Sequence, residues 1–114
     1  MQVETVFVSI NARDFAAQTD WWSQLIGREP DRQPMPSCQE WDLRDGVLFQ
    51  VLDDPDGQRT TVSLAVRDLP SQVRRLRGQG ITLPDPQPVE GFDDLIWTAF
   101  HDPEGNSVNL LDGA

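Results

Sequence analysis

The chain contains a single cysteine, Cys38, and this scarcity excludes two kinds of structure. One thiol cannot close a disulfide within the chain, and it cannot build a metal site from cysteines. Cys38 lies in a proline-rich segment with no obvious base beside it, so we interpret it as an incidental free thiol and not as a nucleophile.

Long apolar runs are also missing. No stretch of the sequence approaches the roughly 18 apolar residues of a membrane-spanning helix. The first ten residues, MQVETVFVSI, alternate as a strand does and do not join a charged segment to an apolar run. We therefore expect no membrane span, no signal peptide, no membrane partner and a cytoplasmic location.

Positive charge is scarce. Nine basic residues stand against 19 acidic ones, which gives a formal net charge of −10 at pH 7. This balance repels a phosphate backbone and leaves no basic stripe, so we expect no nucleic-acid partner. The acidity either keeps the chain in solution or favours a cationic ligand.

Histidine occurs once, as His101, the only side chain that titrates near neutrality without help. It adjoins the Asp102-Pro103 turn at the end of a predicted strand, where a surface histidine is the ordinary finding. No Ser-His-Asp arrangement, glycine-rich phosphate loop or carboxylate pair on one face can be assembled. The sequence therefore predicts no catalytic residue.

What the sequence does contain is an internal repeat. Residues 8–15 align with residues 62–69, and Arg13-Asp14 falls on Arg67-Asp68. Each Asp is expected to cap the helix that follows it. A length of 114 residues suits a single domain, 1–114, with modules of about 1–53 and 58–114 on either side of a polar linker.

Strand candidates surround each predicted helix. They span about 28–33, 38–43 and 46–52 after the first helix, and 81–89, 95–101 and 106–111 after the second. Together with the alternating strand before each helix, these make each half βαβββ. The predicted fold class is α+β, two tandem βαβββ modules forming a cup-shaped mixed sheet with the helices on the outer face.

The last strand shows which side chains share a face. Strand side chains alternate, so Asn109 points the same way as Ser107 and Leu111, while Val108 and Leu110 point into the core. A three-residue loop at 103–105 pairs Trp97 with Leu111, which turns Trp97 into the cup.

Several motifs together resemble one known group of proteins. They are the paired βαβββ modules, the Asp14-capped helix with Trp21-Trp22 that ends in Ile26-Gly27, and the closing turn 102–106. This combination resembles the glyoxalase/bleomycin-resistance/extradiol-dioxygenase group, the vicinal oxygen chelate superfamily, over nearly the whole chain. The chain departs from the group's commoner residues at Ala12 and at Trp21-Trp22. The resemblance implies a cup, often in a homodimer, whose enzyme members hold a divalent metal.

In those enzymes the metal ligands come from the first and fourth strands of each module. The resemblance places Phe7 and Thr61 at the first-strand positions, and Gln50 and Asn109 at the fourth-strand positions. Divalent cations need anionic oxygen or imidazole donors to offset their dehydration. We therefore expect no metal site and no cofactor.

The same parity predicts what lines the cup. Phe7, Ser9 and Asn11 share the uncovered face of the first strand. Trp41 has two alternatives: a two-residue Asp45-Gly46 turn places it in the cup opposite Gln50, and a three-residue loop places it under the helix. The first alternative is slightly favoured. The predicted ligand-binding residues are Phe7, Ser9, Asn11, Trp41, Gln50, Thr61, Trp97 and Asn109.

Exposed aromatic rings beside neutral hydrogen-bonding groups are typical of small-molecule pockets. The leading hypothesis is a metal-independent protein that binds an aromatic or amphipathic metabolite or antibiotic, cationic ligands included, without chemical change. The alternatives are a metal-dependent lyase, isomerase or dioxygenase with ligands in another register, and an interaction domain whose cup is filled by its own side chains. A homodimer is expected from the exposed sheet edges and the resemblance.

Overall fold

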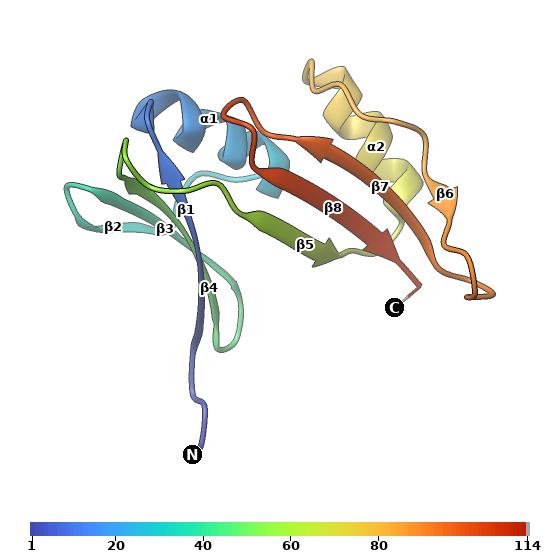
Figure 1. Ribbon diagram of the computed structural model, residues 1–114, viewed down its shortest axis with the longest axis horizontal. Helices are drawn as coiled ribbons and strands as arrows, with labels where there is room; N and C mark the ends of the chain where they lie inside the picture. The colour runs from blue at the N-terminus through green and yellow to red at the C-terminus, as the bar shows by residue number, and fades with distance from the viewer. Residues whose placement is uncertain (114) are drawn as a thin grey trace. The chain divides into compact units, whose positions relative to one another are not determined.

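The computed structural model describes residues 1–113, and the chain divides into two units, Met1–Thr60 and a second that begins at Thr61 (Figure 1). Each unit has one helix and its own four-stranded sheet, in the order βαβββ. The α+β class and the two βαβββ modules are confirmed. The joining of the two sheets into one cup stays a prediction.

The first unit forms a mixed sheet in the order β1-β4-β3-β2, with β1 parallel to β4 and the other pairs antiparallel. The strand predicted at 28–33 begins only at Arg32, and Arg28 and Asp31 form an ion pair in the loop between the helix and this strand. The elements are β1 (Val6–Ala12), α1 (Phe15–Ile26), β2 (Arg32–Met35), β3 (Cys38–Arg44) and β4 (Val47–Asp53).

The second unit repeats this order as β5-β8-β7-β6, with β5 parallel to β8. The strand predicted at 81–89 shrinks to two residues, because the prolines at 84, 86 and 88 have no N–H to donate to a neighbouring strand. The elements are β5 (Thr61–Ala65), α2 (Leu69–Gly78), β6 (Gln87–Pro88), β7 (Ile96–His101) and β8 (Ser107–Asp112).

Both helices begin at the predicted aspartates. A carboxylate oxygen of Asp14 accepts a hydrogen bond from the Ala17 N–H at 3.1 Å, and one of Asp68 accepts from the Ser71 N–H at 3.4 Å. The hydroxyl and N–H of Ser71 both lower the pKa of Asp68. α1 ends at Gly27, whose φ of 95° suits glycine. No helix in residues 1–113 combines the length and the apolar character needed to cross a membrane.

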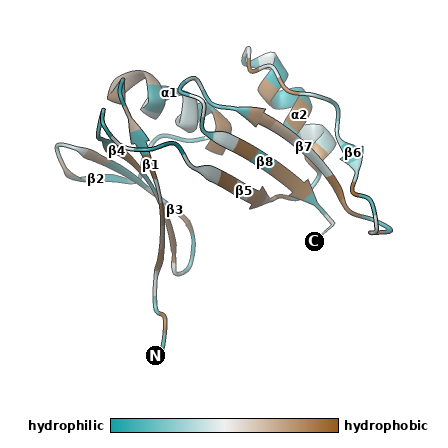
Figure 2. Cartoon of the chain, in the orientation of Figure 1, coloured by the Kyte–Doolittle hydropathy of each residue, from teal (hydrophilic) through white to brown (hydrophobic). Residues whose placement is uncertain are grey.

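Each helix covers one face of its own sheet. In the first unit the Trp22 ring of α1 packs on Phe49 of β4 at 4.6 Å between centroids, and Ile10 and Val51 are fully buried on the same side. In the second unit Val108 and Leu110 are buried, as predicted. Figure 2 shows mainly hydrophobic residues along β7 and β8 and hydrophilic ones along the edge strands β2 and β6. The opposite face of each sheet is left without a helix from its own unit.

The turn between β7 and β8 is organised by a buried carboxylate. Asp102 Oδ1 accepts hydrogen bonds from the N–H groups of Glu104 and Asn106, both at 2.9 Å, and its Oδ2 accepts from the Asn106 side-chain amide at 2.8 Å. Asp102 and Asn106 are 5% and 1% exposed. The turn therefore holds the β7–β8 register through three bonds to one side chain.

Replacing Asp102 with Ala should lower the free energy of unfolding by about 2–3 kcal/mol, because buried donors lose their acceptor. Urea unfolding followed by far-UV circular dichroism measures this change. Asp93→Ala, at an exposed carboxylate in the β6–β7 loop, is the control and should stay within about 0.5 kcal/mol of the parent protein. Equal stability of the two variants would contradict the assigned role of Asp102.

Candidate functional site

The uncovered face of the first sheet carries polar side chains on all of its strands. Ser9 on β1 lies opposite Gln50 on β4, and Gln50 lies opposite Glu40 on β3. Glu40 in turn lies opposite Arg32 on β2. Residues paired across a ladder present their side chains on the same face, so these four form one line across the sheet. We call Ser9, Gln50, Glu40 and Arg32 the polar row.

Hydrogen bonds connect the polar row from end to end. Ser9 Oγ donates to Gln50 Oε1 at 2.8 Å, and Gln50 Nε2 donates to Glu40 Oε2 at 3.0 Å. Arg32 Nη1 donates to Glu40 Oε1 at 2.7 Å, and its other terminal nitrogen pairs with the Asp42 carboxylate. The bonded chain therefore runs without a break from edge strand β1 to edge strand β2.

Glu40 is the buried charge of this face. It is 7% exposed, and a carboxylate so far removed from water needs a charged or hydrogen-bonding partner. Arg32 supplies the charge, and the carboxylates of Asp42 and Glu40 both raise the pKa of its guanidinium. The ion pair therefore holds Glu40 in place with both oxygens occupied.

The expectation that Trp41 lies on this uncovered face is wrong. Trp41 is fully buried on the helix side, 5.7 Å from the Phe49 ring, and its indole nitrogen donates to the Arg28 carbonyl at 3.0 Å. The Asp45-Gly46 turn does have two residues, since Arg44 pairs with Val47. A bulge between Asp42 and Arg44 then shifts the pairing by one residue and exchanges the faces.

The same bulge explains why Glu40 and Arg32 were not among the predicted site residues. An uninterrupted ladder from the Asp45-Gly46 turn pairs Trp41 with Gln50 and sends Glu40 to the covered face. The bulge pairs Glu40 with Gln50 instead. One feature of the sequence does indicate the observed faces. Of the two adjacent residues, Trp41 is large and apolar and Glu40 is charged, so Trp41 is the one expected to be buried under the helix.

The second sheet repeats the hydroxyl–amide pair. Ser63 on β5 lies opposite Asn109 on β8, and Asn109 Nδ2 donates to Ser63 Oγ at 3.1 Å. Across β7 the residue opposite Asn109 is Ala99, where the first sheet has Glu40 opposite Gln50. The second face therefore has the neutral pair of the first without its carboxylate.

Trp97 lies on this second face. It pairs with Leu111, which confirms the predicted register, and it is 39% exposed, whereas its neighbour Thr98 on the other face is buried. His101 lies exposed at the end of the same strand, as predicted. Thr61 is exposed at the start of β5. Uncovered aromatic and hydroxyl groups therefore share a face with the Ser63–Asn109 pair.

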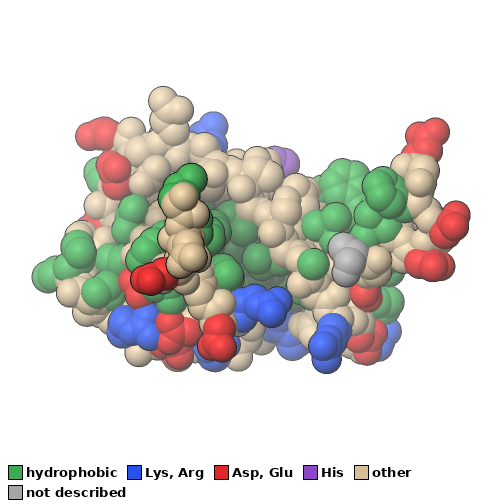
Figure 3. Space-filling view, turned by 90° about the horizontal axis from the view of Figure 1, so that it is seen from below, with side chains coloured by type: hydrophobic (Ala, Val, Ile, Leu, Met, Phe, Trp, Pro, Cys, Tyr) green, Lys and Arg blue, Asp and Glu red, His purple; other side chains and the backbone are tan. Residues whose placement is uncertain are grey.

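Acidic residues gather beside this aromatic surface. Glu90, Asp93 and Asp94 are exposed in the loop between β6 and β7, together with Phe92, which is 62% exposed. Figure 3 shows red side chains at the end of the molecule formed by this loop, next to green hydrophobic ones. The second unit thus combines exposed rings with negative charge.

Phe7 and Asn11 have different surroundings on the first face. Phe7 is 57% exposed opposite Leu48. Asn11 Nδ2 donates to the Gln58 carbonyl at 3.1 Å, and a Cβ at Gly57 would come within 2.3 Å of the Asn11 side chain. Phe7 is free to meet a ligand, whereas Asn11 already holds the segment after β4.

Cys38 is the first residue of β3 and is 1% exposed. Burial raises the pKa of its thiol, with a further contribution from the Glu40 charge. A thiol that stays protonated and covered is a poor nucleophile. This agrees with its interpretation as an incidental free thiol.

The four expected metal-ligand positions do not fit a divalent ion. Phe7 offers a ring, Thr61 a hydroxyl, and Gln50 and Asn109 neutral amides. Glu40 is the carboxylate beside Gln50, and both of its oxygens are already bonded. Within residues 1–113 no group of three or more His, Cys, Asp or Glu side chains is placed to hold a metal.

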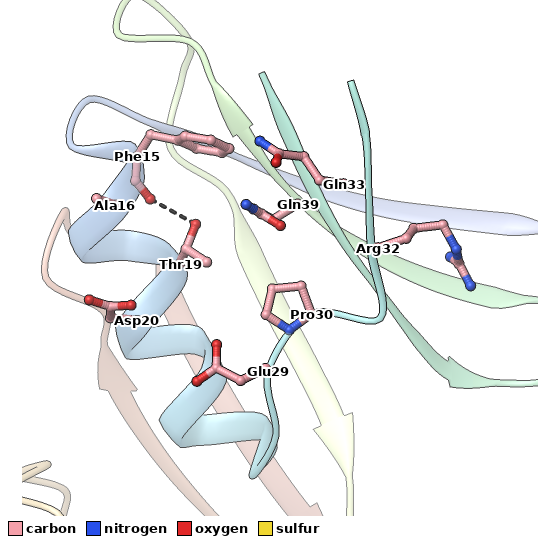
Figure 4. Close-up of a pocket in the computed structure, with 9 residues that line it drawn as sticks. All are labelled: Phe15, Ala16, Thr19, Asp20, Glu29, Pro30, Arg32, Gln33 and Gln39. Carbon is pink, nitrogen blue, oxygen red and sulfur yellow. Dashed lines mark hydrogen bonds between the residues drawn. The ribbon is translucent and has the colours of Figure 1, made fainter. Parts of the chain in front are cut away.

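A pocket of about 520 Å³ lies on the other side of the first sheet, between α1 and the β2–β3 hairpin (Figure 4). The Gln33 amide beside it is held by the Pro36 carbonyl at 3.1 Å, and the Arg32 guanidinium is turned away toward Glu40 and Asp42. Arg32 is the one residue of the polar row that also lines this pocket. It is lined by Phe15, Ala16, Thr19, Asp20, Glu29, Pro30, Arg32, Gln33 and Gln39.

Comparison of the sequence with protein families matches residues 7–111 to the glyoxalase-like domain. No curated protein matches the chain in sequence.

Solved structures match the whole fold at low identity. A glyoxalase/bleomycin resistance protein from Catenulispora acidiphila DSM 44928 has a TM-score of 0.84 and 21% identity, with 96% of this chain and 98% of that chain covered. TnmS3, an antibiotic binding protein from Streptomyces sp. CB03234, has a TM-score of 0.77 and 19% identity, with 100% and 97% covered. Lactoylglutathione lyase from Agrobacterium tumefaciens has a TM-score of 0.76 and 13% identity, with 95% and 92% covered. At these identities the similarity establishes a common fold and no common function.

Proposed function

The chain belongs to the glyoxalase-like domain family, and we propose that it binds a small organic molecule on the uncovered faces of its sheets, without a metal ion and without changing the ligand. Proteins of this fold include an antibiotic binding protein and a lyase, so the fold is compatible with binding and with catalysis. The chemistry of the side chains on the two faces distinguishes binding from catalysis.

The observation that carries the proposal is the pair of neutral hydroxyl–amide contacts. Ser9 with Gln50, and Ser63 with Asn109, lie where the first strand of each unit meets its last strand. These groups offer hydrogen bonds to a ligand but lack the anionic or imidazole donors that a divalent ion needs. Such groups recognise uncharged polar atoms.

Exposed rings supply the apolar part of the proposed site. Trp97 lies opposite Leu111 and one row from Asn109, so an aromatic ligand stacked on the indole has the Asn109 amide on the neighbouring strand and the Ser63 hydroxyl on the strand beyond it. Phe7 lies two residues from Ser9 on β1 and shares its face. A few polar groups among apolar surfaces is the usual makeup of a small-molecule site.

The charge of the chain favours cationic ligands among the aromatic and amphipathic ones. The net charge is −10, and the exposed acids of the β6–β7 loop lie in the same unit as Trp97. A field of this sign raises the local concentration of cations. We therefore place cationic planar compounds, antibiotics among them, in the proposed ligand class, and antibiotic resistance and a cytoplasmic location belong to the same proposal.

Ligand binding should quench tryptophan emission when bleomycin, the cationic dye proflavine or the neutral 1-naphthol is titrated into the protein. Trp97→Ala should weaken the binding of a ligand that quenches by about five- to tenfold, because the stacking surface is lost. Trp21→Phe, on α1, is the matched control and should leave the affinity unchanged. No quenching by any of these compounds, or equal affinity in both variants, would contradict the proposal.

Protein purified without chelator should contain far less than one Mn, Fe, Ni or Zn ion per chain by elemental analysis, because the expected ligand positions hold no anionic or imidazole group. One tightly held ion per chain that is lost in a Gln50→Ala variant would contradict the proposal. That result would favour a metal-dependent lyase, isomerase or dioxygenase instead.

A homodimer also belongs to the proposal. β1 and β2 are the edges of the first sheet, and β5 and β6 are the edges of the second. A strand edge with unpaired backbone groups is a place for a second copy to pair. Analytical ultracentrifugation should give twice the chain mass of 12.9 kDa, and a monomer at all concentrations would exclude the dimer.

A further inference from the structure

We propose that Glu40 is a positioning residue that fixes which groups of the first uncovered face donate and which accept hydrogen bonds, and that this face therefore selects carboxamide ligands. The inference rests on the proposed function, because it names the chemical class of ligand recognised beside Ser9 and Gln50. The direction of each hydrogen bond in the polar row supports it.

The Glu40 carboxylate determines how the Gln50 amide is oriented. An ionised carboxylate accepts hydrogen bonds and cannot donate them, whereas a primary amide can present either its oxygen or its nitrogen. Glu40 Oε1 is taken by the Arg32 guanidinium at 2.7 Å, so Oε2 is left to face Gln50. Gln50 must then turn its nitrogen toward Glu40, and the two lie 3.0 Å apart. Glu40 therefore excludes the reversed orientation of the Gln50 amide.

The orientation of Gln50 determines the role of Ser9. With its nitrogen directed to Glu40, Gln50 directs Oε1 to β1, where the Ser9 hydroxyl donates to it at 2.8 Å. A hydroxyl has one hydrogen, so Ser9 keeps only lone pairs for a ligand. Gln50 keeps the second hydrogen of its nitrogen. A ligand that donates to Ser9 and accepts from Gln50 is complementary, and a carboxamide carries both groups on adjacent atoms.

Arg32 keeps this arrangement in one state. Its guanidinium holds Glu40 from the β2 side and is itself held by the Asp42 carboxylate, so Glu40 cannot swing toward another donor without leaving a charge unpaired. Arginine also stays charged far above neutral pH. The edge strand β2 thus controls the hydrogen-bonding pattern at β1.

The second sheet provides an internal comparison. Asn109 and Ser63 repeat the amide and the hydroxyl, but the residue opposite Asn109 on β7 is Ala99, which has no group to orient the amide. Asn109 donates to Ser63 Oγ, so Ser63 keeps its hydrogen, the reverse of the role of Ser9. The two copies therefore differ in the hydrogen bond that their serine offers.

The orientation can be measured without a ligand, by NMR of the side-chain amides in the ¹⁵N-labelled full chain. In the parent protein the bonded hydrogen of Gln50 should exchange with solvent about five- to tenfold more slowly than the hydrogens of Asn109, because its bond to a carboxylate is charge-assisted. Glu40→Gln should remove this difference. Ala99→Glu places a carboxylate opposite Asn109 in the second sheet and leaves Glu40 unchanged. In this variant the amide hydrogens of Asn109 should exchange more slowly with solvent than in the parent protein. Unchanged exchange in both variants would overturn the proposal.

Selection is tested with two probes of nearly equal shape, benzamide and acetophenone, of which only benzamide has N–H donors. Chemical-shift titrations should show benzamide binding beside Ser9 about fivefold more tightly than acetophenone in the parent protein, and about equally in Glu40→Gln. Equal binding of the two probes to the parent protein would overturn the selection. If neither probe shifts any signal of either uncovered face while Gln50 shows the expected exchange, the proposed function fails and the orientation of Gln50 is upheld.

Discussion

The parallel pairing of the first strand of each unit with its last strand is the constraint on which the rest of the structure depends. β1 pairs with β4 and β5 with β8, in registers that set Ser9 beside Gln50 and Ser63 beside Asn109. A parallel connection needs a crossover, and the helix that provides it covers one face of the sheet only. The polar pairs therefore lie on the face that the helix leaves open.

The two units share this strand pairing but differ in the side chains next to the serine–amide contact. Both keep an aspartate at the helix start and a serine–amide contact at the centre of the open face. They differ on the neighbouring strand, where Glu40 stands in one copy and Ala99 in the other. A carboxylate at this place orders the amide beside it, and a methyl group leaves the amide to its serine alone. A duplicated unit can in this way acquire two different recognition surfaces without any change of fold.

Much of this arrangement could be predicted from the sequence, because strand parity and helix caps are local properties. The capping aspartates and the Trp97–Leu111 pairing follow from residues close in sequence, and the structure confirms them. The faces of Trp41 and Glu40 could not be predicted, because one bulged residue between Asp42 and Arg44 reverses the parity of the strand before it. The Arg32 contact depends on that bulge as well, so the polar row was visible only in three dimensions.

The most direct test of the central claim is a crystallographic screen in which crystals of the chain are soaked with a library of small aromatic amides, amines and alcohols. The account predicts that bound fragments gather on the uncovered faces, in contact with Ser9 and Gln50 or with Asn109 and Trp97, with no metal ion between fragment and protein. Fragments confined to the pocket between α1 and the β2–β3 hairpin would contradict it. So would a metal ion bound by Gln50 or Asn109.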